Sequence, residues 1–323
     1  MENIPRVSVL VPMHNAEPYI VQTLESILVE TGVALEVIVI NDNSTDQSLE
    51  KVLSARDDRI RIVNGPGLGI SACLNAGLAA SVGSIIMRCD ADDLYPVGRI
   101  KKQVAWLDAN PEYGAVCGSF SMLDTSGGLI AELATGDKSG NITEELNGGI
   151  TRTHFCSYAI RRSAIQCVGG FRPYFVTAED IDFQLRLGEM AKIMYLPHNF
   201  YMYRLHDASI THTQGNIKRI FFENTARSFL SQRRESGQDD LQRGIPPDPP
   251  GEILDIPEAA GKQIQGILIG AAWNAHCAGN RWKAIVFGYR ALKYNPRDVR
   301  MWRSFLALVV KPIKKGLGKL KRI

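Results

Sequence analysis

The regular alternation of short apolar runs with amphipathic stretches constrains the fold of this chain most. Runs with the length and composition of buried strands lie at 7–11, 35–40, 59–63 and 84–88. Segments with apolar residues at helical spacing lie between them, at 17–30, around 52–53 and at 74–80. This alternation predicts an α/β fold in which helices flank a mostly parallel sheet with right-handed crossovers.

Polar segments follow each of the four predicted strands. They lie at 12–15, 41–44, 65–71 and 90–93. In open parallel sheets, ligands bind outside the carboxyl ends of the strands, so we expect all four segments to converge on one edge and to hold the functional side chains. Pro12 is predicted to end the first strand, because proline cannot donate to a sheet ladder.

Three carboxylates, Asp90, Asp92 and Asp93, lie within four residues directly after the fourth strand. Clustered carboxylates repel one another unless a cation or a partner lies among them. Oxygen ligands of this kind suit Mg²⁺ or Mn²⁺, which in turn bridge substrate phosphates. An acidic turn that caps a helix is the simpler alternative, but the position at the end of a strand favours the metal site.

Other polar residues each allow two interpretations. Asp42 can bind a base or ribose, or it can cap a turn, and the glycine loop at 65–69 can cradle phosphate or serve as a structural turn. The loop does not match a dinucleotide fingerprint, which belongs after the first strand. The acids at 179, 180 and 182 can interact favourably with the dipole at the start of a helix, or one of them can act as a general base. His206 becomes a metal or phosphate ligand only if its segment returns to the carboxylates.

The rest of the chain has a different character. A mixed pattern runs from about 114 to 204, with short strands expected near 115–116 and 193–196. The segment 236–257, which contains a Pro-rich stretch at 244–251, is interpreted as a linker. Residues 259–294 are predicted to be helical, with core candidates Trp273, Trp282 and Phe287. After Asp298, basic and apolar residues alternate without another acid, which suits either an anionic membrane surface or a last helix packed on the protein.

Composition sets limits on partners and location. A net charge of +3 over 323 residues is too small to indicate nucleic acid as a partner. Neither a secretion leader nor an apolar run of about 18 residues is evident, and the six cysteines lack C-x-x-C spacing. We therefore expect a cytoplasmic protein with reduced, buried thiols, located peripherally at the inner face of the membrane if the basic segment binds lipid.

Taken together, the segments resemble the inverting GT-A glycosyltransferases of family 2. The first strand and its turn at 7–16, the second-strand segment at 39–46, and the run Met-Arg-Cys-Asp-Ala-Asp-Asp at 87–93 carry the resemblance. Pro96, Arg99 and Gln103 follow that run, and segments at 171–172, 178–180 and 203–209 complete the expected order. The resemblance covers roughly residues 5–215. Leu74 departs from the pattern, since many relatives carry Arg before the Asn at position 75.

The resemblance implies a Rossmann-like GT-A sheet and transfer of a sugar, with a UDP-sugar favoured, to a saccharide or lipid-linked acceptor with inversion. Such enzymes act in cell-surface polysaccharide or glycolipid synthesis. By this resemblance, Asp180 would be the general base, with Glu179 its nearest rival. The metal, Mg²⁺ or Mn²⁺, would be held by Asp90, Asp92 and His206. The nucleotide-sugar would contact Pro12, His14, Asn15, Asp42, Gly67, Asn75, Arg88, Asp90 and Ala91.

The expected organisation is a GT-A domain at 1–215, divided into a nucleotide-binding half to about 113 and an acceptor half at 114–215. A helix and Pro-rich linker at 216–258 and a helical C-terminal extension at 259–323 follow, with residues 299–323 as the possible membrane contact. A nucleotidyltransferase is an alternative, but it would need a basic glycine-rich loop after the first strand, which 13–16 is not. A non-catalytic nucleotide-sugar-binding homologue would keep every motif and stays open.

Overall fold

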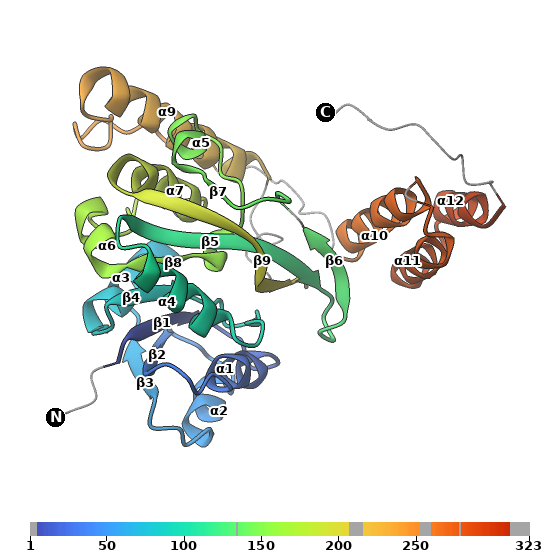
Figure 1. The fold of residues 1–323 in the computed structure, drawn as a ribbon, viewed down its shortest axis with the longest axis horizontal. Helices are drawn as coiled ribbons and strands as arrows, with labels where there is room; N and C mark the ends of the chain where they lie inside the picture. Colours follow the sequence, from blue (N-terminus) through green and yellow to red (C-terminus); the bar gives the residue numbers. More distant parts are fainter. Residues whose placement is uncertain (1–4, 134, 207–215, 252–259, 278, 311–323) are drawn as a thin grey trace. The chain divides into compact units, whose positions relative to one another are not determined.

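The computed structural model describes residues 5–133, 135–206, 216–251, 260–277 and 279–310 (Figure 1). The chain divides into two compact units. The first unit comprises Met1–Ser121, Glu132–Tyr203 and Asn216–Asp255. The second unit comprises Met122–Ala131, Arg204–Gly215 and Ile256–Ile323.

A parallel sheet forms the N-terminal half of the first unit, for which the sequence predicts nucleotide binding. The strands lie in the order β3-β2-β1-β4, and every neighbouring pair among them is parallel. Their bounds are β1 Val7–Met13, β2 Leu35–Asn41, β3 Ile60–Asn64 and β4 Ile85–Arg88. The connecting helices are α1 Ile20–Leu28, α2 Ser48–Ser54 and α3 Ile70–Ala80. The predicted alternation of strands and helices is therefore confirmed.

Pro12 does not end the first strand, which corrects the sequence-based prediction. Strand β1 continues through Pro12 to Met13, and Pro12 pairs with Ile40 of β2. Backbone groups alternate between the two neighbouring strands, and Leu10 bonds on the β4 side, where its carbonyl accepts from Cys89 N at 2.9 Å. The nitrogen of Pro12 faces the same side, beyond the end of β4, so its missing N–H removes no ladder bond.

An antiparallel half extends the sheet from β4 in the order β8-β5-β9-β7, with β6 paired to β5. Its strands are β5 Tyr113–Leu123, β6 Leu129–Leu133, β7 Gly140–Asn141, β8 Ala159–Arg161 and β9 Lys192–Arg204. Strands β5 and β9 are much longer than the short runs predicted near 115–116 and 193–196. Polar residues interrupt their apolar pattern, and two of these bond to each other across the sheet, with Asn199 Nδ2 donating to Ser121 Oγ at 2.6 Å.

Two apolar clusters cover the two faces of the sheet. Val9 and Val11 pack with α1, α2 and α4 (Arg99–Ala109), whereas Leu10 packs on the other face with α3, α6 (Arg162–Val168) and α7 (Glu179–Met190). Successive residues of a strand point to opposite faces, so a strand buried on both sides is apolar throughout. Three further elements complete the first unit: α5 Thr143–Asn147, a 3₁₀ turn η1 Phe155–Ser157, and α9 Asn216–Ser236.

The C-terminal region contains α10 Ala260–Cys277, α11 Arg281–Tyr294 and α12 Val299–Val310. The stretch predicted as one helical segment is thus divided, and the Asn280 side chain caps α11 by accepting from Lys283 N at 3.1 Å. Trp282 is 76% exposed, so its prediction as a core residue was wrong, while Trp273 and Phe287 are partly buried. None of the helices in the described ranges combines the length and hydropathy needed to cross a bilayer.

The cysteines follow the prediction in part. Cys73, Cys89, Cys117 and Cys156 are buried free thiols, whereas Cys167 and Cys277 are free but exposed.

Candidate active site

The turns after β1 and β2 are bonded to each other. His14 Nδ1 lies 2.7 Å from the carbonyl oxygen of Asp42, and a carbonyl can only accept, so this nitrogen carries the proton. Asn15 has a positive φ of 50°, and its Oδ1 accepts from Thr45 N at 2.8 Å. Its own backbone N–H donates to Ser44 Oγ at 3.2 Å. The first two segments predicted to bind the donor therefore do meet at one edge of the sheet.

The glycine loop packs tightly against the turn after β2. Asp42 Oδ1 accepts from Gly67 N at 2.7 Å, and a Cβ atom on Gly65 would lie 2.5 Å from the same oxygen. Gly67 has a positive φ of 70°, and its Cβ would meet Asn43 Nδ2 at 2.4 Å. The glycines thus permit a close backbone approach, which agrees with the interpretation of this loop as a structural turn. Within the described ranges, Asp42 Oδ2 accepts no hydrogen bond and is available to a ligand.

Arg88, the last residue of β4, joins the carboxylate motif to the start of α7. Its Nε donates to Asp90 Oδ1 at 2.6 Å, and its Nη1 donates to Glu179 Oε1 at 3.0 Å. Burial raises the pKa of Glu179, although the charge of Arg88 opposes this effect. Burial acts to lower the pKa of Arg88, but the charges of its neighbours, Asp90 first, hold it well above its ordinary value.

The three clustered carboxylates have different surroundings. Asp93 is fully buried and accepts a hydrogen bond from the Tyr201 hydroxyl, so it belongs to the core. Asp90 is part-buried, and its Oδ2 also accepts from the Cys156 thiol at 3.7 Å, while Asp92 is half-buried. Only two of the three acids are therefore placed to meet a ligand.

The residues present fit a divalent cation that is bound together with a substrate. Within the described ranges, no group of three or more His, Cys, Asp or Glu side chains is arranged to hold a metal ion. Mg²⁺ rarely needs such a cage, because one or two carboxylates, water and substrate phosphates complete its octahedron. Asp90 and Asp92 supply this number of carboxylates. His206 belongs to the second unit and is buried, and its role as a ligand stays a prediction.

The start of α7 places two acids in different environments. Ala178 precedes the helix in the left-handed region at φ 57°, a conformation that costs a residue other than glycine about 1–3 kcal/mol. Glu179 is buried and paired with Arg88, whereas Asp180 is half-buried. Both lie in the first turn, where the helix dipole favours negative charge.

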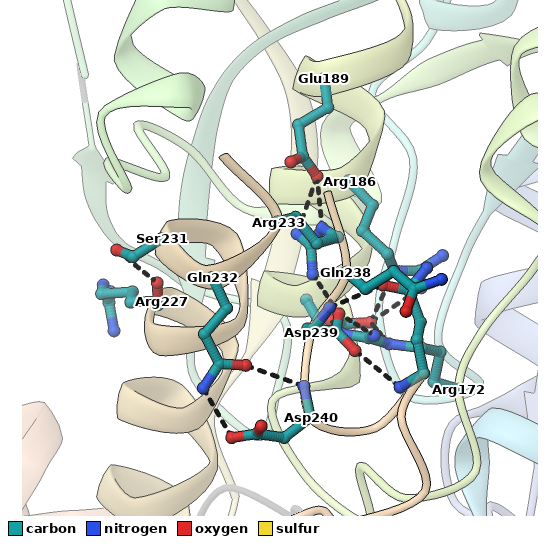
Figure 2. Close-up of polar contacts among 12 residues, drawn as sticks. Arg172, Arg186, Glu189, Arg227, Ser231, Gln232, Arg233, Gln238, Asp239 and Asp240 are labelled. Carbon is teal, nitrogen blue, oxygen red and sulfur yellow. Dashed lines mark hydrogen bonds and ion pairs between the residues drawn. The ribbon is translucent and has the colours of Figure 1, made fainter. Parts of the chain in front are cut away.

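A buried network of arginines and acids holds α7 in place (Figure 2). Asp182 accepts from Arg186 at 2.8 Å and from Arg172 Nε at 3.0 Å. Asp239, beyond the end of α9, is fully buried and accepts from Arg172 at 2.6 Å and from Arg233 at 2.5 Å. Part of the segment predicted to be a linker is thus packed against the helix that begins with Glu179, because Asp239 completes these ion pairs.

Several polar side chains of the predicted motifs form hydrogen bonds to backbone groups of the protein, which leaves these atoms unavailable to a ligand. Asn75 Nδ2 donates to Phe171 O at 2.7 Å, and its Oδ1 accepts from Phe171 N at 2.9 Å, so its amide fixes the loop before α7. Buried Arg99 donates to Tyr158 O at 3.1 Å, and buried Gln103 donates to Ser157 O at 2.9 Å. Pro12 and Ala91 are buried and can offer only their backbone groups.

Sequence reasoning missed two side chains near Asp180. His154 caps the 3₁₀ turn, and burial lowers its pKa, while the charges of Asp180 and Asp90 act against this shift. Arg219, at the start of α9, loses basicity through burial, but its hydrogen bond to Glu223 and the charge of Asp180 raise its pKa overall. A single His and a single Arg in mixed segments give no periodic signal. Only the fold brings them to the acids.

A parallel sheet with its ligand edge at β1, β2 and β4, joined to an antiparallel half, defines a GT-A type of nucleotide-binding fold. The family model for glycosyl transferase family 2 matches residues 8–169, about half of the chain, and the chain belongs to this family.

Known relatives share parts of the sequence. An uncharacterized glycosyltransferase of Haemophilus influenzae is 41% identical over 143 residues, covering 42% of this chain and 44% of the relative. Chondroitin synthase of Pasteurella multocida is 29% identical over 208 residues, covering 64% of this chain and 21% of the relative. The probable glycosyltransferase YdaM of Bacillus subtilis is 32% identical over 206 residues, covering 58% of this chain and 47% of the relative. The chain thus spans less than half the length of each of these relatives.

Among solved structures, residues 1–349 of Staphylococcus aureus TarS in complex with UDP-GlcNAc share the fold. The TM-score is 0.54 at 15% identity, and the alignment covers 94% of this chain and 79% of that chain.

Proposed function

We propose that this protein transfers a sugar from a UDP-sugar to a hydroxyl group of a saccharide or lipid-linked acceptor, with inversion at the anomeric carbon. The observation that carries the proposal is the pairing of Arg88 with both Asp90 and Glu179. Through this bridge, the carboxylate motif of the donor edge lies beside the helix that begins with two acids. Membership of glycosyl transferase family 2 supports the same reaction.

The donor would lie along the turns after β1, β2 and β4. Asp42 has a free carboxylate oxygen for a nucleobase, and the bonded turns of His14 and Asn15 form the adjacent surface. UDP is favoured because the solved structure of the same fold holds UDP-GlcNAc. Asn75 has its amide committed to Phe171, so we leave it out of the donor site.

Asp90 and Asp92 would hold Mg²⁺ or Mn²⁺ together with the diphosphate of the donor. When bound, the cation would neutralise the charge that develops on the departing nucleoside diphosphate. Arg88 fixes Asp90 through a hydrogen bond of 2.6 Å and so orients this carboxylate before the donor arrives.

Asp180 is the proposed general base. The acceptor oxygen forms a bond to the anomeric carbon, its proton passes to the Asp180 carboxylate, and the bond from that carbon to the diphosphate oxygen breaks. Glu179, its rival, is buried and already accepts a hydrogen bond from Arg88. We therefore propose that Glu179 holds Arg88 in place and so fixes the start of α7 beside the carboxylate motif.

The decisive experiment measures binding and hydrolysis of UDP-, GDP- and dTDP-sugars with and without Mn²⁺. Wild type should release one nucleoside diphosphate in a metal-dependent reaction, and Asp92→Ala should lose it. Asp58→Ala, which changes an exposed acid away from the motif, is the matched control. Absence of nucleotide binding under both conditions would contradict the transferase proposal, and the motifs would then be structural turns.

A second proposal concerns the membrane. Helix α12 exposes Val299, Trp302, Leu306 and Val310, which recur at helical spacing, and basic residues follow in the sequence to 323. An apolar stripe beside Lys and Arg suits an anionic lipid surface and would place a lipid-linked acceptor at the inner leaflet. Full-length protein should sediment with vesicles of anionic phospholipid, and protein ending at residue 298 should not. Equal sedimentation of both would contradict this proposal.

A further inference from the structure

His154 is held by contacts that fix both its ring plane and its tautomer. Its Nδ1 accepts a hydrogen bond from Cys156 N at 3.2 Å, and a backbone N–H can only donate. The neutral ring therefore carries its proton on Nε2. The ring stacks on Tyr201 with 5.1 Å between centroids and 14° between planes, and Tyr203 and Phe120 lie at 5.4 Å and 5.5 Å.

The other ring nitrogen, Nε2, has no hydrogen-bond partner in the part of the chain that the structure describes. The ring is half-buried, and no described group accepts a hydrogen bond from Nε2, so this nitrogen stays within reach of a ligand. A donor without a protein acceptor at a half-buried position can complete its hydrogen bond with a ligand. The charged groups that act on the ring are those of the active site, with Asp180 and Asp90 as anions and Arg88 and Arg219 as cations.

Two contacts tie His154 to the carboxylate motif. Tyr201, on which the ring stacks, accepts a hydrogen bond from Asp90 N at 3.1 Å. Cys156, which donates its backbone N–H to the ring, also donates its thiol to Asp90 Oδ2 at 3.7 Å. The ring position is thus set by the same side chains that surround Asp90.

We propose that His154 is a substrate-binding residue whose Nε2–H donates a hydrogen bond to a hydroxyl oxygen of a sugar held between Asp90 and Asp180. This inference rests on the proposed glycosyl transfer and deepens it by naming a contact to the saccharide rather than to the nucleotide. The acids around the site can only accept hydrogen bonds when ionised, so they recognise the hydrogens of sugar hydroxyls. A neutral N–H supplies the opposite polarity and recognises the oxygen.

A matched pair of variants tests the roles of the two ring nitrogens, Nδ1 and Nε2, separately. In His154→Asn, Oδ1 can replace Nδ1 as the acceptor for Cys156, but no donor remains at the position of Nε2. In His154→Gln, the longer amide can place an N–H near Nε2 and gives up the bond to Cys156. We expect His154→Asn to lose roughly tenfold to a hundredfold in kcat/KM, because one substrate hydrogen bond is removed, while its melting temperature falls only through the loss of ring stacking that both variants share. His154→Gln should keep most of the activity at lower stability.

Binding of UDP without a sugar serves as the second readout, and both variants should bind it as wild type does. The two possible sources of the hydroxyl are told apart by hydrolysis of the UDP-sugar without acceptor. A loss in His154→Asn places the contact on the donor sugar, and a rise only in the KM for the acceptor places it on the acceptor. Full transfer activity of His154→Asn, or an equal loss in both variants, would overturn the inference. If wild type binds no nucleotide-sugar, the proposed function itself fails.

Discussion

Two regions of the first unit are built in different ways. One is the proposed donor edge, at the turns after β1 and β2, and the other is the proposed acceptor side, around the start of α7. At the donor edge, each polar residue directly follows its own strand, and the bonds join neighbouring turns, as between Asn15 and Thr45. On the proposed acceptor side, the contact that joins α7 to the carboxylate motif links distant segments, because Arg88 and Glu179 are 91 positions apart. The first arrangement follows from a repeated βα pattern, whereas the second exists only after the whole sheet has formed.

This difference has a consequence for tolerance to mutation. Exposed bonds between turns are numerous and individually weak, because water can replace a lost partner. Buried ion pairs cannot be replaced by water, so the removal of one partner leaves an uncompensated charge. We therefore expect substitutions on the acceptor side to cost more than substitutions at the donor edge.

The largest effect is expected at the start of α7, where Asp180→Asn removes the proposed base. The fall in kcat should be about 10²–10⁴-fold, because a positioned proton acceptor contributes that much. Affinity for UDP should stay near the wild-type value, as measured by calorimetry. Glu179→Gln is the control, since it keeps a side chain that can still accept from Arg88. A greater loss in Glu179→Gln than in Asp180→Asn would reverse the assignment of the two acids.

The second effect concerns the buried network around α7. Asp239→Ala removes the carboxylate shared by Arg172 and Arg233, and the free energy of unfolding should fall by about 3 kcal/mol. Urea denaturation measures this change. Asp248→Ala, at an exposed acid of the same loop, should change it by less than about 0.5 kcal/mol. Equal small effects would show that the segment after α9 does not stabilise α7.

The same variant has a defined pH dependence. Burial acts to raise the pKa of Asp239, but hydrogen bonds from Arg172, from the Gln242 backbone and from Arg233 outweigh it and lower the pKa. A lowered pKa in the folded state gives stability that is present above the unfolded pKa of about 4 and is lost as the pH falls through the folded pKa. The difference between wild type and Asp239→Ala should therefore be full at neutral pH and shrink below about pH 4.

Sequence alone predicted the parallel half well, because buried strands and amphipathic helices leave periodic patterns that do not depend on distant contacts. It predicted the placement of Asp42 and Asp90 for the same reason, since each follows a strand of the parallel half. It could not distinguish Asp93, whose burial depends on Tyr201, 108 positions away. Trp282 was assigned to the core from its apolarity, but the small side chains Ala284, Ala291 and Gly288 form the packed face of that helix.

His154 and Asn75 both show that sequence patterns do not tell which polar side chains face a ligand. The sequence did not indicate His154, and it indicated Asn75 although the amide of Asn75 bonds to backbone. His154 carries no pattern in the sequence, yet the fold stacks it on Tyr201 beside the carboxylate motif. Asn75 was assigned to the donor by resemblance, yet both ends of its amide bond to Phe171. Whether a polar side chain meets a ligand depends on which backbone groups the fold leaves without partners, and no local pattern contains that information.

A third, smaller effect tests the role of Asn75. Asn75→Ala removes two hydrogen bonds and leaves the Phe171 backbone groups without their partners, so the free energy of unfolding should fall by about 1–3 kcal/mol. Affinity for UDP should stay within about threefold of wild type if the residue only positions the loop before α7. A large loss of UDP affinity at unchanged stability would return Asn75 to the donor site.

The smallest effect is expected at the donor edge, where Ser44→Ala removes the acceptor for Asn15 N. This bond is exposed, and Asn15 keeps its second bond to Thr45, so the free energy of unfolding should fall by no more than about 0.5–1 kcal/mol. UDP affinity, measured by the same calorimetry, should fall by about fivefold at most. A cost equal to that of Asn75→Ala would break the comparison, because it would mean that the turns of the donor edge depend on single bonds as the acceptor side does.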